Sequence, residues 1–233
     1  MMNTKRRFRH AVTGGLALAV VACLTGGCQD AADTLPPPEV KTVTAYGQTL
    51  DESATPQQVA YVLLRSLAED VQAAQAKPPR REDQKQANLI TWSVAAPNTI
   101  EQRILSTARE HAKDPARFQS LGENRKKEIY RVVNQWAPIV AYYVASFDQD
   151  PETAMSRMHV RPSPNGQVTH ILYEVTPDPT RPDVDQRRTL DIELVKEKGA
   201  DGKEYWRVAR VGYIGLGTRP TTQPAGTQPA KAE

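Results

Sequence analysis

Residues 167–175, QVTHILYEV, decide the fold, because they read as a strand with two different sides. One side carries Val168, His170, Leu172 and Glu174, and the other carries Thr169, Ile171, Tyr173 and Val175. A period of two places successive side chains on opposite sides of a strand. The pattern returns in residues 189–196, where Leu190, Ile192 and Leu194 share a side, and residues 205–214 are rich in β-forming residues. The sequence therefore predicts three long antiparallel strands near its C-terminal end.

A short fourth strand is predicted over Met158–Arg161, because Asn165-Gly166 is a hairpin turn signal between it and the first long strand. A two-residue turn there pairs Arg161 with His170 and His159 with Leu172. One face of the sheet then carries four polar side chains, His159, Arg161, His170 and Glu174.

Histidine beside a carboxylate can act as a general base, and arginine can hold an anion. His170, Glu174 and His159 are therefore the candidate catalytic residues, and Arg161 is the candidate binding residue. The competing interpretation is the solvated face of a half-buried sheet, where mixed charges are common.

Helices are predicted before the strands. Thr55-Pro56-Gln57-Gln58 forms a capping box with proline at the first helical position, and Pro78-Pro79 ends that helix. A weaker helical pattern covers residues 82–95, and a third begins after Pro97 with Asn98 and Glu101 as its cap. The apolar stripe from Ile129 to Phe147 keeps its phase across Pro138, which predicts a kinked helix, and Asp150-Pro151-Glu152 begins a short one.

This order of elements predicts an α+β fold, with N-terminal helices packed on one face of a C-terminal antiparallel β-meander. The long capped helix, the middle helices and the closing strand with Tyr205-Trp206-Arg207-Val208 resemble the nuclear-transport-factor-like cone fold. That superfamily includes ketosteroid isomerase and scytalone dehydratase. The resemblance implies a pocket on the concave sheet face and a dehydratase, cyclase or isomerase that uses His170 with Glu174 or His159.

The N-terminus has the pattern of an export signal, because residues 1–10 are basic and Ala11–Leu24 is an uncharged apolar run. The following Leu24-Thr25-Gly26-Gly27-Cys28 resembles a bacterial lipobox, although Thr25 departs from the usual aliphatic residue. The resemblance implies cleavage before Cys28 and a diacylglycerol on its thiol. Val20-Val21-Ala22-Cys23 also fits, so Cys23 is the alternative lipidation site.

These features divide the chain into four predicted parts. They are a signal peptide (1–27), a flexible tether (28–53), one α+β domain (54–215) and a disordered tail rich in Pro, Thr and Gln (216–233). Of the 233 residues, 30 are basic and 27 acidic. Loss of residues 1–27 leaves 26 basic residues against 27 acidic ones, so no basic excess points to nucleic acid.

Motifs for chemistry are few. The sequence has no phosphate-binding glycine loop, no Gly-x-Ser-x-Gly elbow and no His-Glu-x-x-His. His111 is expected on an exposed helix face, and the three tryptophans are expected in the core. Asp178, Asp183 and Asp185 do not have the spacing of a calcium loop and are expected in a solvated loop. No metal or cofactor is expected.

The prediction for function is a membrane-anchored lipoprotein of the bacterial cell envelope, with its domain outside the cytoplasm. Its partners are expected to be the bilayer, through acylated Cys28, and an envelope protein or small ligand, but not nucleic acid. The domain is predicted to bind without catalysis; the alternative is a small cone-fold enzyme with a His/carboxylate site.

Overall fold

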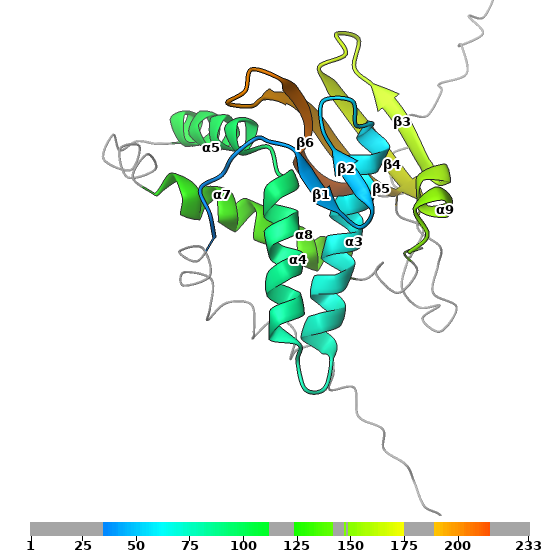
Figure 1. The fold of residues 1–233 in the computed structure, drawn as a ribbon. Coiled ribbons are helices and arrows are strands. Elements are labelled where there is room, and N and C mark those ends of the chain that lie inside the picture. The colour runs from blue at the N-terminus through cyan, green and yellow to red at the C-terminus, as the bar shows by residue number, and fades with distance from the viewer. Residues whose placement is uncertain (1–34, 112–123, 142–146, 148, 175–188, 215–233) are drawn as a thin grey trace, which may run out of the picture. The chain divides into compact units, whose positions relative to one another are not determined.

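The computed structural model describes residues 35–111, 124–141, 147, 149–174 and 189–214, and Pro37 begins its one large compact unit. A short β-hairpin and a series of helices precede a four-stranded antiparallel sheet, which confirms the predicted α+β fold (Figure 1). The predicted signal peptide, both cysteines, the loop with Asp178, Asp183 and Asp185, and the predicted tail from residue 216 lie outside the described residues.

A β-hairpin opens the domain where a flexible tether was expected to run as far as residue 53. Strand β1 (Val43–Ala45) pairs antiparallel with β2 (Gln48–Leu50), and Tyr46 and Gly47 turn the chain with positive φ angles of 52° and 73°. Glycine accepts such angles without strain, and two in succession suit a tight hairpin. Leu50 is completely buried. The prediction of a tether over 28–53 is therefore wrong for its last part.

Helix α3 (Pro56–Gln75) begins as predicted, with the complete capping box between Thr55 and Gln58. Its buried side chains occur at helical spacing and include Val59, Leu63 and Leu67. Helix α4 (Arg81–Val94) packs against it as an antiparallel hairpin (Figure 1). Helix α3 therefore supplies more buried apolar side chains than any other helix in the described part of the chain.

Helix α5 (Pro97–His111) is capped differently from the prediction. Asn98 and Glu101 do not form a capping box; the backbone N–H groups of Asn98 and Thr99 donate instead to the carboxylate of Glu197, a residue of the sheet. An anion at a helix N-terminus satisfies free N–H groups and complements the helix dipole. The cap was not predictable locally because its acid lies about one hundred residues away.

Where the structure describes it, the predicted kinked helix is two helices, α7 (Arg125–Asn134) and α8 (Trp136–Val140); residues 142–146 of the apolar stripe lie outside the described residues. The break falls at Gln135 rather than at Pro138. A proline lacks the N–H that would bond the carbonyl four residues earlier, and its ring collides with that carbonyl. That residue is Asn134, where α7 ends. The proline therefore acts one turn upstream of its own position.

The sheet has the order β3-β4-β5-β6, with strands β3 (Met158–Pro162), β4 (Val168–Glu174), β5 (Thr189–Lys198) and β6 (Glu204–Ile214). The short helix α9 (Pro151–Ser156), capped by Asp150 as predicted, leads into β3. All neighbouring strands are antiparallel, so the predicted meander is confirmed.

The two faces of this sheet have different chemistry. The inner face carries Ile171, Ile192 and Leu194, which are completely buried, and Tyr173. Tyr173 contacts Phe147, and Phe147 contacts Tyr61 of α3, with ring centroids 6.0 Å apart in both pairs. The inner face therefore looks toward α3. The outer face, formed by the alternate residues, carries the polar side chains.

Helix α5 lies against the outer face, since Glu197 caps it there and a small apolar cluster forms beside it. The cluster contains Ala96, Val195 and Ala209, with Val168 packed against it. Helices on a single sheet face were predicted; the sheet instead has helical cover on both. Among the described helices, none is long and apolar enough to cross a membrane.

Candidate functional site

The four polar residues predicted to share a sheet face do share one. Arg161 is paired with His170 and His159 with Leu172, as the Asn165-Gly166 turn predicted. The turn is closed by Ser163 N–H to the Val168 carbonyl (2.8 Å) and Gly166 N–H to the Ser163 carbonyl (3.0 Å). The face they occupy is the outer one, away from α3.

His170 has a partner that was not predicted. Its Nδ1 lies 2.8 Å from Oδ1 of Asp191 on β5. Glu174, the predicted partner, is four residues along the same strand, and a strand rises about 3.3 Å per residue, so their Cα atoms are about 13 Å apart. Glu174 instead approaches His159, with Oε1 3.9 Å from Nε2. The predicted pairing of His170 with Glu174 is not formed.

Asp191 belongs to a larger ionic network, here named the outer-face cluster, of His170, Asp191, Glu193, Arg210 and Arg103. Arg210 of β6 bridges the two acids, with Nη2 2.8 Å from Asp191 Oδ2 and Nε 3.3 Å from Glu193 Oε2. Arg103 of α5 donates through both terminal nitrogens to the two oxygens of Glu193. The cluster joins three strands and a helix by side chains alone.

A β-bulge places Arg210 in this cluster. Leu194 pairs with Val208 and Glu193 with Arg210, so Ala209 is an extra residue in β6. A bulge reverses the alternation of side chains beyond it. Trp206 and Val208 therefore share the inner face, whereas Arg210 and Ile214 turn outward. Without the bulge, Arg210 would point into the apolar core.

The carboxylates of the cluster lie beneath the guanidinium groups. The side chains of Asp191 and Glu193 are 11% and 10% exposed, against 50% for Arg210 and 44% for Arg103. Burial raises the pKa of Glu193, but hydrogen bonds and charge from Arg103, then Arg210, outweigh it, so the pKa is lowered overall. Glu193 is therefore a fixed anion at neutral pH.

Asp191 orients His170 but also binds Arg210. A carboxylate on the ring Nδ1 fixes the imidazole and can support a general base at Nε2. Arg210 holds the other oxygen of Asp191, so that charge is already compensated. His159 and Glu174 have side chains 65% and 73% exposed. The geometry suits a rigid, charged contact surface better than an enclosed catalytic site.

Arg207 and Glu197 form the other end of the outer face, where the sheet is covered. Arg207 has no exposed surface, and burial lowers its pKa to about 10, while the charge of Glu197 opposes this shift. The guanidinium donates to the backbone carbonyls of Trp206 and Lys41. A buried cation needs such acceptors, so Arg207 binds the incoming chain to the sheet.

Other predicted positions carry less information. Trp92 and Trp136 are buried in the core as expected, whereas Trp206 is half-buried with the Lys196 ammonium 5.4 Å from its ring centroid. His111 ends α5, but its side chain is not among those described. The described residues contain no group of three or more side chains that could hold a metal ion. Asp178, Asp183 and Asp185 lie outside the described residues.

The acids of the cluster were visible in the sequence. Leu190, Ile192 and Leu194 were predicted on one side of a strand, which places Asp191 and Glu193 together on the other side. The missing information was Arg103, which comes from a helix, and the bulge at Ala209.

Comparison with known proteins adds no functional assignment, since no family description, curated protein or solved structure matches the chain. The resemblance to the cone fold and to lipoproteins stays a prediction.

Proposed function

We propose that the protein is a lipid-anchored component of the bacterial cell envelope whose domain binds a partner protein through the outer face of its sheet. The outer-face cluster carries this proposal. Its two acids are bound by two arginines and a histidine, which gives a surface of alternating charge whose carboxylates already have ionic partners. Such surfaces give specificity to protein association through charge complementarity.

The anchor is supported by the order of features in the sequence: basic residues, an apolar run, small residues and then Cys28. Stable attachment needs more than one acyl chain, because each buried methylene contributes only about 0.8 kcal/mol. A diacylglycerol on Cys28 supplies two chains. No membrane-spanning helix in the domain is then required.

The anchor is tested by labelling cells with a fatty-acid probe. Cys28→Ser should abolish labelling and move the protein into the aqueous phase of a detergent partition, whereas Cys23→Ser should leave both unchanged. Loss of labelling in Cys23→Ser alone would move the site to Cys23. Labelling unaffected by either substitution would refute the anchor.

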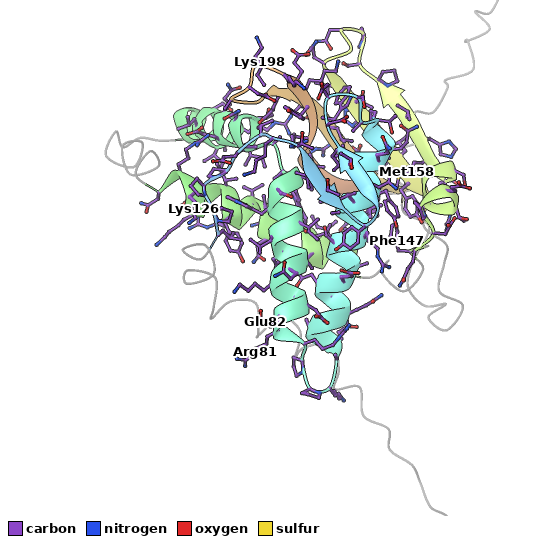
Figure 2. The ribbon with its side chains drawn as sticks, viewed as in Figure 1. Arg81, Glu82, Lys126, Phe147, Met158 and Lys198 are labelled. Atoms are coloured by element: carbon purple, nitrogen blue, oxygen red, sulfur yellow. The ribbon has the colours of Figure 1, made fainter. Side chains whose placement is uncertain are left out.

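The binding surface is tested with a photo-crosslinking residue placed at Arg161, an exposed outer-face position. The control is the same residue at Arg81, which lies at the tip of the α3–α4 hairpin (Figure 2). Illumination of intact cells should yield one discrete adduct from position 161 and none from position 81. Equal adducts from both positions, or from neither, would contradict the proposed surface.

An enzyme is the second candidate, and the 2.8 Å contact between His170 and Asp191 favours it. In that case His170→Gln would abolish turnover while leaving the adduct at position 161 intact. For a binding surface, the same substitution would reduce the adduct. The two functions therefore predict opposite results for a single variant.

A further inference from the structure

Residues 37–42, here named the entry segment, are built into the domain. Val40 is buried, and the carbonyl of Lys41 accepts a hydrogen bond from Arg207. Gly199 faces the same segment, since a β-carbon at that position would lie 2.6 Å from the Val40 carbonyl oxygen. Glycine is therefore required where the chain passes the end of β5.

Arg207 makes this attachment costly to break. Its guanidinium remains a cation at neutral pH even though burial lowers its pKa to about 10. Releasing Lys41 would leave a buried donor of that cation without its acceptor, which costs more than the loss of a neutral hydrogen bond. The entry segment is thus held by a charge that has no exposed surface.

The chain stays attached beyond the entry segment. The Tyr46 hydroxyl donates to Glu69 of α3 at 2.8 Å, and the guanidinium of Arg65 lies 5.6 Å from the centroid of the Tyr46 ring. Lys203 bonds Glu52 at 2.6 Å. Contacts to the domain therefore continue from Val40 to the start of α3, so none of these residues serves as free tether.

We infer that the domain is held beside the surface of its own membrane and that its partner is a protein exposed at that surface. This inference rests on the proposed anchor at Cys28. Only residues 29–36 then separate the lipid from Pro37, and eight residues span at most about 30 Å. A tether reaching residue 53 would have spanned up to about 90 Å.

The charge of the outer face favours a protein over lipid as the partner. Within the outer-face cluster, Arg103 and Arg210 balance Asp191 and Glu193. Attraction to an anionic bilayer needs an excess of basic residues, at about 1 kcal/mol for each one near the surface. A balanced surface gains little from lipid headgroups, whereas it can match alternating charges on a protein.

Energy transfer tests the reach of the tether. A donor dye is attached to Lys198→Cys, an exposed position at the end of β5 (Figure 2), in the lipidated mature protein. Acceptor dyes are carried by lipid headgroups in vesicles. The comparison protein has seventeen Gly/Ser residues inserted between Pro36 and Pro37, which gives a 25-residue tether.

Transfer should be clearly more efficient without the insertion, because the longest span that the tether allows rises from about 30 Å to about 90 Å. Arg207→Lys removes the forked guanidinium group. Its transfer efficiency should fall toward that of the protein with the insertion, and protease should cleave its entry segment more readily. Equal transfer in the native and inserted proteins, both bound to vesicles, would overturn the inference. Failure of the native protein to bind vesicles would instead refute the anchor.

A separate experiment tests whether the outer face binds a protein or lipid headgroups. The mature chain with Cys28→Ser should remain in solution with vesicles rich in anionic lipid. Co-sedimentation that Arg161→Gln abolishes and Arg81→Gln does not would overturn the choice of a protein and assign the outer face to lipid.

Discussion

The two faces of the sheet bury their side chains by different means. On the inner face, Ile171, Ile192 and Leu194 are completely buried and their strands pack toward α3. On the outer face, α5 is held by the ion pair of Arg103 with Glu193 and by Glu197 at its N-terminus. The same strand β5 supplies both sets, since its residues alternate between leucine or isoleucine and acid.

The comparison assigns most of the folding stability to the apolar inner face and most of the binding specificity to the charged outer face. Apolar burial is strong and non-directional, and it tolerates exchange among side chains of similar volume. Ion pairs that are partly exposed contribute little net free energy, but they fix the position of α5 relative to the sheet. The inner face should therefore dominate folding and the outer face recognition.

The largest effect is expected on the inner face. Ile192→Ala should lower the free energy of unfolding by about 2–5 kcal/mol, because it removes buried methyl groups and leaves a cavity. The measurement is urea denaturation of the mature Cys28→Ser chain. Leu172→Ala is the matched outer-face control, half-buried in the native protein, and should cost about 1 kcal/mol or less. A larger loss from Leu172→Ala would reverse the comparison.

The fold was largely predictable, because most of its helices and strands are indicated by patterns among residues close together in the sequence. Period-two alternation predicted β4 and β5, and the content of β-forming residues predicted β6. The Asn165-Gly166 turn predicted the register of β3, and the capping box predicted the start of α3. The β1–β2 hairpin was not predicted. Its strands of three residues are too short to stand out from a polar segment rich in proline.

The candidate site was predictable only in part, because half of it depends on distant pairing. Register brought His170 and Arg161 together, and alternation would have added Asp191 and Glu193. No local pattern places Arg103 of α5 over Glu193, or turns Arg210 outward at a bulge. Side chains contributed by tertiary packing are what a single sequence conceals.

The second prediction tests the outer face directly. Glu193→Gln should lower the free energy of unfolding by about 1–2 kcal/mol, since it leaves two half-exposed arginines without a shared anion. Glu174→Gln, an exposed carboxylate on the same face, should have no measurable effect. A double-mutant cycle with Arg103→Gln should show that the two losses are not additive. Additive losses would mean that Arg103 and Glu193 are not coupled.

The pH dependence of this effect has a defined sign. The pKa of Glu193 is lowered in the folded protein from its ordinary value of 4.5. Its stabilising contribution is therefore present above pH 4.5 and is lost as the pH falls through the lowered value. The difference between native protein and Glu193→Gln should shrink over that range. A difference that persists at the lowest pH would point to packing rather than charge.

The last and smallest effect concerns a buried carboxylate between helices α3 and α4. Asp70 of α3 faces α4 and is buried, and its Oδ1 has no hydrogen-bond partner among the described residues. Burial raises its pKa, and a hydrogen bond with Gln84 opposes the shift only in part. Asp70 and Glu193 are thus buried acids shifted in opposite directions, because only Glu193 has arginine partners.

Asp70→Asn should consequently raise the free energy of unfolding at pH 7, because the neutral amide removes the cost of burying a carboxylate charge. A raised pKa means that the folded state binds the proton more tightly than the unfolded state. Stability is therefore highest below the unfolded value, near 3.8, and is lost as the pH rises through the folded value. The free energies of unfolding of the native protein and of Asp70→Asn should therefore be similar below pH 3.8 and differ above it. Asp83→Asn, on the exposed side of α4, should give no such separation. If Asp70→Asn lowered the free energy of unfolding at pH 7, the charged carboxylate would have a favourable partner. Asp70 and Glu193 would then not differ in the way proposed.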